Sequence, residues 1–439
     1  MNSVSAPVGQ VEGRAPALTP RTPTPRTPTN WQAPDMQRRL KRRYAAERRF
    51  RLFGMSAVVM SALFLVYLLV TMLGSGLNGF QRTEVKLPID FAALDLPVTR
   101  AQLAGRGADL ALASAGLEEQ VSVAAAKAFG PGGEDMISDS AWTRVREAVK
   151  KDPSLLKRQA VIAVPAASQI DAAARGSGKA EAKAAYARLE QAGALQTGFN
   201  WGFLTNADST DAGAVGIWGA LKGSLMTMLV TLLIAFPVGV LSAVYLEEYA
   251  PKNRWTDLIE VSINNLAAVP SIIFGLLGLA VFLGTFGLPR SAPLVGGMTL
   301  ALMIMPVIVI AGRNAIKAVP PSIRDAALAI GASRIQVVFH HVLPLALPGI
   351  LTGTIIGMAR ALGETAPLLM IGMRAFIAQP PGGLTDPATV LPVQIFLWSD
   401  EVSRGFVEKT SAAIVVLLLF LLAMNGLAIY LRNKFETRW

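Results

Sequence analysis

Six long apolar runs interrupt this chain of 439 residues, and they constrain its fold more than any other feature. The runs are Leu52–Leu73 and, roughly, Gly223–Leu246, Asn264–Phe286, Leu294–Gly312, Ala346–Gly372 and Ser411–Leu431. At 1.5 Å per residue, a helix of about 20 residues crosses the ~30 Å hydrocarbon core of a bilayer. The sequence therefore predicts an all-α polytopic membrane protein with six transmembrane helices.

The composition agrees with a membrane protein and disfavours several other classes. Hydrophobic residues make up 52% of the chain and charged residues 16%. A disordered chain would be less hydrophobic, and a soluble nucleic-acid binder would carry more charge, so we expect no nucleic-acid partner. The chain has no cysteine, and its only histidines, His340 and His341, are adjacent rather than spaced as a ligand pair. We therefore expect no metal site and no catalytic residues.

The N-terminal part combines a polar tail with a basic segment. Residues 1–37 are rich in proline and poor in apolar side chains, which predicts a disordered cytoplasmic tail. Residues 38–73 form a basic juxtamembrane segment and the first transmembrane helix, with no cleavage pattern after it. Lysines and arginines beside a first span are retained inside, so the N-terminus is predicted to be cytoplasmic. Contact of these arginines with membrane lipid is expected, and nucleic-acid binding is the less favoured alternative.

The segment 74–216 has the composition of a soluble domain and contains no apolar run of twenty residues. Because long loops cross the membrane largely regardless of their charge, we predict an extracytoplasmic domain inserted between helices 1 and 2. Glu84–Phe91 has the pattern of a strand, and helices are predicted at Ala115–Ala128, Ser138–Lys151 and Ala180–Ala192. No chemical motif stands out in this domain, and its role is left open.

Residues 217–439 form a predicted core with the other five transmembrane helices. Six crossings from an inside N-terminus return the C-terminus to the cytoplasm. Basic residues gather on the predicted inside, namely Arg432, Lys434 and Arg438 in the C-terminal tail and Arg313, Lys317, Arg324 and Arg334 around the loop after the fourth run. This distribution agrees with the positive-inside rule.

The loop from Val319 to Ile350 carries a spaced motif, made of Asp325, Ala326, Ala327, Gly331, Leu343 and Pro344. Ser322 is suited to cap a helix, and Gly331 to end it so that a second helix turns away. A short helix of small residues that protrudes into the cytoplasm suits a groove on a partner. The alternative is an amphipathic helix that lies at the membrane interface without a partner.

Arg360 and Glu364 are the only charged residues within the six runs. Four residues apart, they share one helix face and can pair. A charge at the bilayer centre costs about 2.5 kcal/mol or more, so both require a partner or a water-filled cavity. Arg360 offers a planar set of donors to an oxyanion, and Glu364 can accept a hydrogen bond from the hydroxyl of monohydrogen phosphate. Fully deprotonated sulfate has no such hydroxyl. The alternative is a salt bridge that only fixes helix packing.

From about Trp201 to its C-terminus, the chain resembles the integral membrane permease subunit of the bacterial high-affinity phosphate ABC importer. The loop at 325–344 is similar to the EAA loop of such permeases. It differs at two positions, because Asp325 stands where the loop usually has glutamate and His341 where it commonly has isoleucine. The other matching pieces are GIWGALKGSLMTM (Gly216–Met228), YLEEYAPKNRW (Tyr245–Trp255), AVPSIIFGLLGL (Ala268–Leu279), ARALGETAPLL (Ala359–Leu369) and LPVQIF (Leu391–Phe396).

This resemblance implies a type I ABC importer permease in the bacterial inner membrane, forming half of a phosphate pathway. It implies three partners: a homologous second permease subunit, a dimeric cytoplasmic ATPase and a periplasmic phosphate-binding protein. The chain lacks a Gly-x-x-x-x-Gly-Lys-Ser/Thr loop, so we expect no cofactor here and ATP on the partner. The resemblance makes Arg360 a pore arginine. Arg313 is the nearest candidate for a second one, with a positive-inside anchor as its alternative.

Four other functions are possible for such a sequence. A permease for sulfate or molybdate would keep the EAA-type loop but should lack Glu364. A membrane receptor with an outside sensor would explain residues 74–216, but it predicts two spans only. A secondary transporter would need an ion site and usually an inverted repeat, and none is visible in the sequence. A membrane enzyme is least favoured.

Overall fold

The computed structural model describes residues 33–94, 98, 103, 108–176, 178–373, 376–401 and 405–435. The predicted disorder of residues 1–32 and the basic Arg438 lie outside the described residues. The chain divides into two compact units, Met1–Leu68 and Leu69–Trp439.

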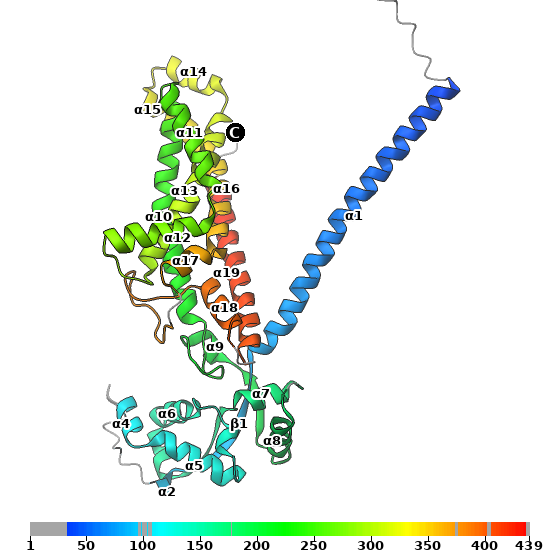
Figure 1. Cartoon of the computed structure of the whole chain (residues 1–439). Coiled ribbons are helices and arrows are strands. Elements are labelled where there is room, and N and C mark those ends of the chain that lie inside the picture. The colour runs from blue at the N-terminus through cyan, green and yellow to red at the C-terminus, as the bar shows by residue number, and fades with distance from the viewer. Residues whose placement is uncertain are drawn as a thin grey trace, which may run out of the picture. The chain divides into compact units, whose positions relative to one another are not determined.

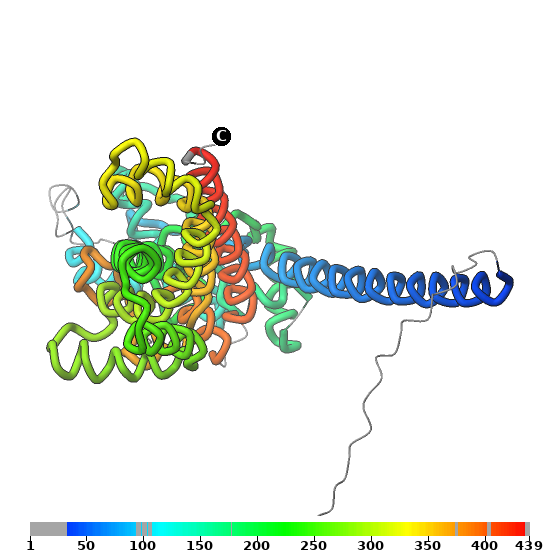
Figure 2. Tube along the Cα trace, turned by 90° about the horizontal axis from the view of Figure 1, so that it is seen from above, coloured from blue at the N-terminus to red at the C-terminus, as the bar shows by residue number. Residues whose placement is uncertain are grey.

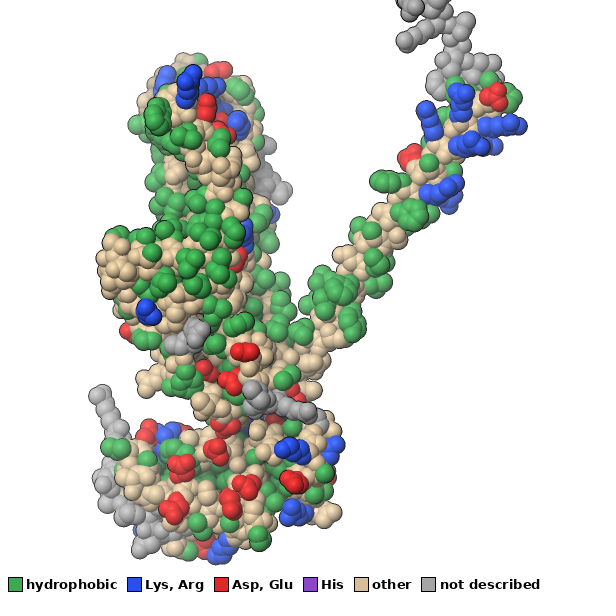
Figure 3. Space-filling model, viewed as in Figure 1, with side chains coloured by type: hydrophobic (Ala, Val, Ile, Leu, Met, Phe, Trp, Pro, Cys, Tyr) green, Lys and Arg blue, Asp and Glu red, His purple; other side chains and the backbone are tan. Residues whose placement is uncertain are grey.

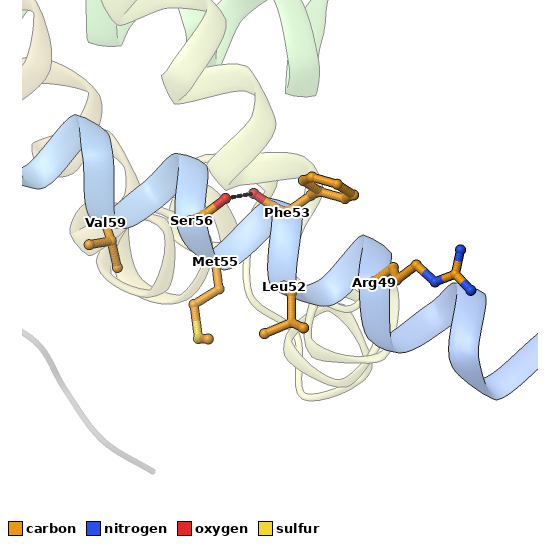
Figure 4. Close-up of a pocket in the computed structure, with 6 residues that line it drawn as sticks. All are labelled: Arg49, Leu52, Phe53, Met55, Ser56 and Val59. Carbon is orange, nitrogen blue, oxygen red and sulfur yellow. Dashed lines mark hydrogen bonds between the residues drawn. The ribbon is translucent and has the colours of Figure 1, made fainter.

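One continuous helix, α1 (Pro34–Gly79), contains both the basic segment and the first apolar run. The helix begins three residues before the predicted end of the tail at residue 37. Figure 4 shows Arg49 from the basic part of the helix, which ends at Arg51, and Leu52, Met55 and Val59 from the apolar part that follows. The hydroxyl of Ser56 donates to the carbonyl of Phe53 at 2.9 Å, so this polar group is satisfied within the helix.

The inserted domain is built on a three-stranded antiparallel sheet with the order β2-β1-β3. Its strands are β1 (Gln81–Asp90), β2 (Gln159–Pro165) and β3 (Leu195–Phe199). In β1, Val85, Leu87 and Ile89 alternate into the core, as the predicted strand pattern requires. The helices are α2 (Phe91–Leu94), α4 (Ala108–Ser114), α5 (Leu117–Phe129), α6 (Ala141–Lys151), α7 (Ser168–Ala174) and α8 (Ala180–Gln191). Helices α5, α6 and α8 match the three predicted ones.

A helical bundle follows the inserted domain (Figure 1). Its elements are α9 (Trp201–Thr205), α10 (Trp218–Val244), α11 (Arg254–Ala267), α12 (Ser271–Gly278), α13 (Pro293–Lys317), α14 (Pro321–Ala329), α15 (Arg334–Gln336), α16 (Leu343–Gly363), α17 (Ala366–Met370), α18 (Leu391–Ser399) and α19 (Gly405–Phe435). Wider π-type turns continue three of the helices, at Tyr245–Tyr249 after α10, at Leu279–Thr285 after α12 and at Val337–Val342 before α16. Among the described residues, five helices are long and apolar enough to span a membrane: α1, α10, α13, α16 and α19 with their extensions.

The predicted third span is broken rather than straight. Helices α11 and α12 meet at an angle of 101°, so the run Asn264–Phe286 does not form one continuous helix. Pro270 stands at the N-terminal cap of α12 and disfavours helical backbone at Val269 before it. Helix α11 begins earlier than predicted because the side chain of Asn253 accepts hydrogen bonds from the amides of Trp255 and Thr256.

Close glycine contacts show that the bent pair still carries the chain across the bundle. Gly297 and Gly312 of α13 face Val230 and Ala243 of α10 in the same order along both chains, so these helices run in the same direction. A return pass must therefore lie between them, and α11 with α12 is the only segment available. The resulting path has six passes when the bent pair counts as one.

Helix α16 runs opposite to α13, because Gly349 and Gly357 meet Ala315 and Ile304 respectively. Figure 1 and Figure 2 show α10, α13, α16 and α19 gathered in this bundle. We call the end where α10, α13 and α19 begin the insertion end, and the opposite end, which carries α14, the loop end. On the face seen in Figure 3, hydrophobic side chains cover the middle of the bundle, and charged ones gather near α14 and on the inserted domain.

Candidate functional site

The Arg360–Glu364 pair lies where α16 breaks. Arg360 occupies the last turn of α16, and Glu364 follows the helix end with extended backbone at φ −78° and ψ 127°. The Arg360 Nε lies 3.5 Å from Oε1 of Glu364, so the predicted pairing is confirmed. The prediction that Ala346–Gly372 forms one helix is wrong, because α16 ends at Gly363 and α17 begins at Ala366.

The two charged side chains differ in exposure. That of Arg360 is 46% exposed and that of Glu364 is 19% exposed. The arginine lies on the open side of α16, whereas the next two residues, Ala361 and Leu362, are buried in the bundle. Because the carboxylate leaves most of the guanidinium donors uncovered, Arg360 can bind an anion while it remains beside Glu364.

Helix α12 packs against α17, the short helix that follows this break. A Cβ on Gly275 would lie 2.6 Å from Cα of Pro367, and one on Gly278 would lie 2.5 Å from Oγ1 of Thr299. Both glycines therefore allow α12 to approach α17 and α13 closely. The sequence signal for this role is the small-residue spacing in the third apolar run. Gly275 thus helps to position the segment that carries Glu364.

Arg313 lies apart from this pair. Gly353 of α16 packs on Ala311 of α13, which places Arg360 and Arg313 about nine residues of helical rise apart, or ~13 Å along the axis. Two carboxylates hold Arg313, with Nη2 at 2.9 Å from Glu260 and Nε at 3.4 Å from Glu247. These ion pairs tie α13 to α11 and to the turn that follows α10, near the loop end.

The predicted coupling motif forms α14 and the turn after it. Asp325 and Ala326 are exposed and Ala327 is buried, so the small residues present one face outward and one to the bundle. The helix ends before Gly331, whose φ of 91° is a conformation that favours glycine. Leu343 and Pro344 begin α16. The expected Ser322 cap is wrong, because Pro320 occupies the N-cap and Pro321 the first helical position.

Arg324 fixes this helix to the bundle. Its Nη2 lies 2.7 Å from Oε1 of Glu248 and also donates to the carbonyl of Ile316, while Nη1 donates to that of Val319. The guanidinium thereby joins the start of α14, the end of α13 and the turn after α10. A displacement of α14 would be transmitted to both long helices through these contacts.

Other charged residues lie within the spanning helices but outside the six apolar runs, so the prediction that Arg360 and Glu364 are the only charges in the spans is wrong. Helix α19 begins at Gly405 and so includes Glu408 and Lys409, which precede the apolar run. Lys409 is 4% exposed, donates to the carbonyl of Gly79 at 2.8 Å and lies 5.5 Å from the Phe203 ring centroid. Glu408 forms an ion pair with Arg175 of the inserted domain. Helix α13 likewise includes Arg313 and Lys317.

Two buried hydroxyl groups of the bundle were not predicted. Thr227 and Thr389 are each 1% exposed, and no hydrogen-bond partner is found for their hydroxyl groups among the described residues. Beside Thr227, Ala361 and Leu362 lies a cavity of about 10 Å³, close to the size that holds one water molecule. Over the described residues, no group of acidic or histidine side chains forms a metal site.

Two parts of the chain match protein-family models. Residues 235–437 match the family model of the binding-protein-dependent transport system inner membrane component. Residues 37–184 match a separate domain of unknown function, so the basic helix and most of the inserted domain belong to a recurring unit. Among solved structures, an inward-facing MetNI methionine ABC transporter chain gives a TM-score of 0.37 at 19% identity, covering 51% of this chain and 95% of that chain.

Several relatives of known name are similar in sequence. The probable ABC transporter permease protein YqgI of Bacillus subtilis is 38% identical over 38% of this chain and 56% of its own length. The phosphate transport system permease protein PstA 1 of Mycobacterium tuberculosis is 36% identical over 36% of this chain and 51% of its own length. The chain thus spans about half the length of these relatives.

A longer match comes from the phosphate transport system permease protein PstA of Haemophilus influenzae. It is 31% identical over 48% of this chain and 73% of its own length. The matched residues lie in a bundle with six passes and a loop of the expected spacing. The chain therefore belongs to the permease family of binding-protein-dependent transport systems, in the group that contains the phosphate transport system permeases.

Proposed function

We propose that this chain is the membrane-spanning subunit of an ATP-driven phosphate importer and forms half of its translocation pathway. The observation that carries the proposal is the Arg360–Glu364 pair at the broken end of α16, with the guanidinium half exposed. Its relatives named as phosphate transport system permeases support the same substrate.

Arg360 donates hydrogen bonds to the phosphate oxygens, and Glu364 accepts a hydrogen bond from the phosphate hydroxyl. A carboxylate beside fully deprotonated sulfate would find no donor on the ligand, and it would be repelled by the charge. The second candidate is an importer of another oxyanion, sulfate or molybdate. The Glu364 carboxylate, 19% exposed at the same helix break, favours phosphate over it.

The chain lies in the bacterial inner membrane with both termini in the cytoplasm. The arginine-rich start of α1 supports this orientation through the positive-inside rule. The loop end with α14 then faces the cytoplasm, and the inserted domain faces outward. Arg324 and Arg334 lie at this loop end, as the rule predicts.

Transport proceeds by alternating access, and ATP is bound and hydrolysed on a dimeric cytoplasmic ATPase. The exposed face of α14, with Asp325 and Ala326, docks in a groove of that ATPase, and Arg324 passes its movement to α10 and α13. A second permease subunit completes the pathway, and a periplasmic phosphate-binding protein delivers the substrate. Only a difference in phosphate affinity between outward and inward states can drive uptake, so Arg360 holds phosphate briefly.

A second phosphate contact at Arg313 stays a prediction. It would lie nearer the cytoplasm than Arg360, and Glu247 and Glu260 would have to release the guanidinium for the anion.

Uptake of radiolabelled phosphate and sulfate tests this function in cells with and without the chain. We expect phosphate uptake at micromolar concentration to require the chain, and sulfate uptake to be unchanged by its loss. Sulfate uptake that depends on the chain, with phosphate uptake unaffected, would contradict the proposed substrate.

A further inference from the structure

An apolar groove of about 380 Å³ runs along the outside of the bundle between α10, α16 and α19. It is lined by side chains that include Leu233 and Phe236 of α10, Ile355 and Met358 of α16, and Leu427 and Leu431 of α19. From Leu351 to Met358 it follows about two helical turns, or ~10 Å. Its volume falls within the range of small-molecule sites.

Arg432 lies at the loop end of this groove. Arg432 follows Leu431 directly, and its Nη1 is 3.4 Å from the hydroxyl of Thr352, which follows Leu351. Its Nη2 donates to the side-chain oxygen of Asn433 at 3.3 Å, and no acceptor for its buried Nε is found in the described part of the chain. Among the described residues, no carboxylate lies within ion-pair distance of Arg432. The oxygens that the described residues offer to this guanidinium are therefore neutral ones.

We propose that this groove binds an anionic phospholipid, with one acyl chain against α10, α16 and α19 and the phosphate group beside Arg432. The apolar walls suit a hydrocarbon chain, because burial of its surface requires no hydrogen-bonding partner. The phosphodiester supplies the negative charge that Arg432 lacks, and guanidinium groups bind phosphate oxygens through paired donors. Basic sites between membrane helices are known to hold anionic lipid headgroups in this way.

The negative charge of its headgroup distinguishes an anionic phospholipid from other possible occupants of the groove. A neutral lipid or an apolar helix would fill the groove equally well but would offer no negative charge to Arg432. The site is separate from the Arg360–Glu364 pair, which lies beyond Met358 towards the other end of α16. In the proposed orientation, the headgroup belongs to the cytoplasmic leaflet, where anionic lipids are found.

Native mass spectrometry of the full-length purified chain tests the site, with phosphatidylglycerol and phosphatidylcholine of identical acyl chains added in equal amounts. We expect phosphatidylglycerol to be retained preferentially, by about fivefold for one arginine at a membrane surface. Arg432→Gln should remove the preference. Lys434→Gln is the matched control, because it removes the same charge from an exposed position two residues further on and should leave the preference intact.

The acyl-chain part of the site is tested separately with Ala428, which lines the groove. Ala428→Trp should reduce retention of both lipids, whereas Ala423→Trp, at an exposed position outside the groove, should not. A photoreactive residue at position 428 should give a lipid adduct in membranes. A peptide adduct, or equal retention of both lipids by the unaltered chain and by Arg432→Gln, would overturn the proposal.

Discussion

Arg360→Ala should abolish phosphate uptake while the subunit still inserts and assembles. The variant removes the donors that hold the anion, and charge-assisted hydrogen bonds of this kind contribute about 1.5–3 kcal/mol, or roughly 10- to 100-fold in affinity. Arg360→Lys keeps the charge but loses the planar fork, so we expect intermediate uptake. The measurement is initial-rate uptake of radiolabelled phosphate, normalised to the amount of assembled complex.

Two further variants separate substrate binding from helix packing. Arg290→Ala is the matched control, because it removes an exposed arginine near the start of α13 and should leave uptake unchanged. The double variant Arg360→Ala with Glu364→Ala removes both members of the ion pair. If the pair only fixed packing, the double variant would recover uptake relative to Arg360→Ala; in our account it stays inactive.

Ala326→Trp should release the ATPase from the purified complex. The position is exposed on α14, so the larger side chain is tolerated within this subunit but obstructs docking into a partner groove. We expect the amount of co-purified ATPase to fall by at least about tenfold, since the clash affects the centre of a small interface. Phosphate uptake should fall in parallel.

Ser322→Trp provides the control, because Ser322 is exposed at the start of the same helix but outside the motif at 325–331. It should retain more ATPase than Ala326→Trp. Undiminished co-purification of ATPase with Ala326→Trp would show that α14 is not the docking element.

Apolar runs predicted the bundle well, but they could not predict where its helices break. Hydropathy measures whether a segment prefers lipid, and it is the same for a straight helix and a bent one. Pro270 signalled the first break. The second, after Gly363, depends on α12 packing against Pro367 through Gly275, a contact between segments far apart in sequence. The six passes that the runs predict agree with the helix directions once the bent pair is counted as one pass.

Among the site residues, contacts between neighbours in the sequence could be predicted, and contacts between distant segments could not. The spacing of Arg360 and Glu364 predicted their ion pair because the two are only four residues apart, although Glu364 lies just beyond the end of α16 and not on its face. The partners of Arg313 come from α11 and from the turn after α10, and no local pattern reveals them. Lys409 was missed because it precedes the apolar run. Helix α19 begins at Gly405, four residues before Lys409, and buries this side chain.

Anion selectivity of the reconstituted importer tests the central claim most directly, namely that Arg360 and Glu364 recognise monohydrogen phosphate. The measurement is uptake of labelled phosphate into proteoliposomes at increasing sulfate, with the unaltered chain and with Glu364→Gln compared at equal complex. We predict that sulfate competes poorly with the unaltered chain and at least about tenfold better with Glu364→Gln, because the variant replaces a carboxylate that repels sulfate by an amide that can donate to it. Equal sulfate competition in both proteins would contradict the account.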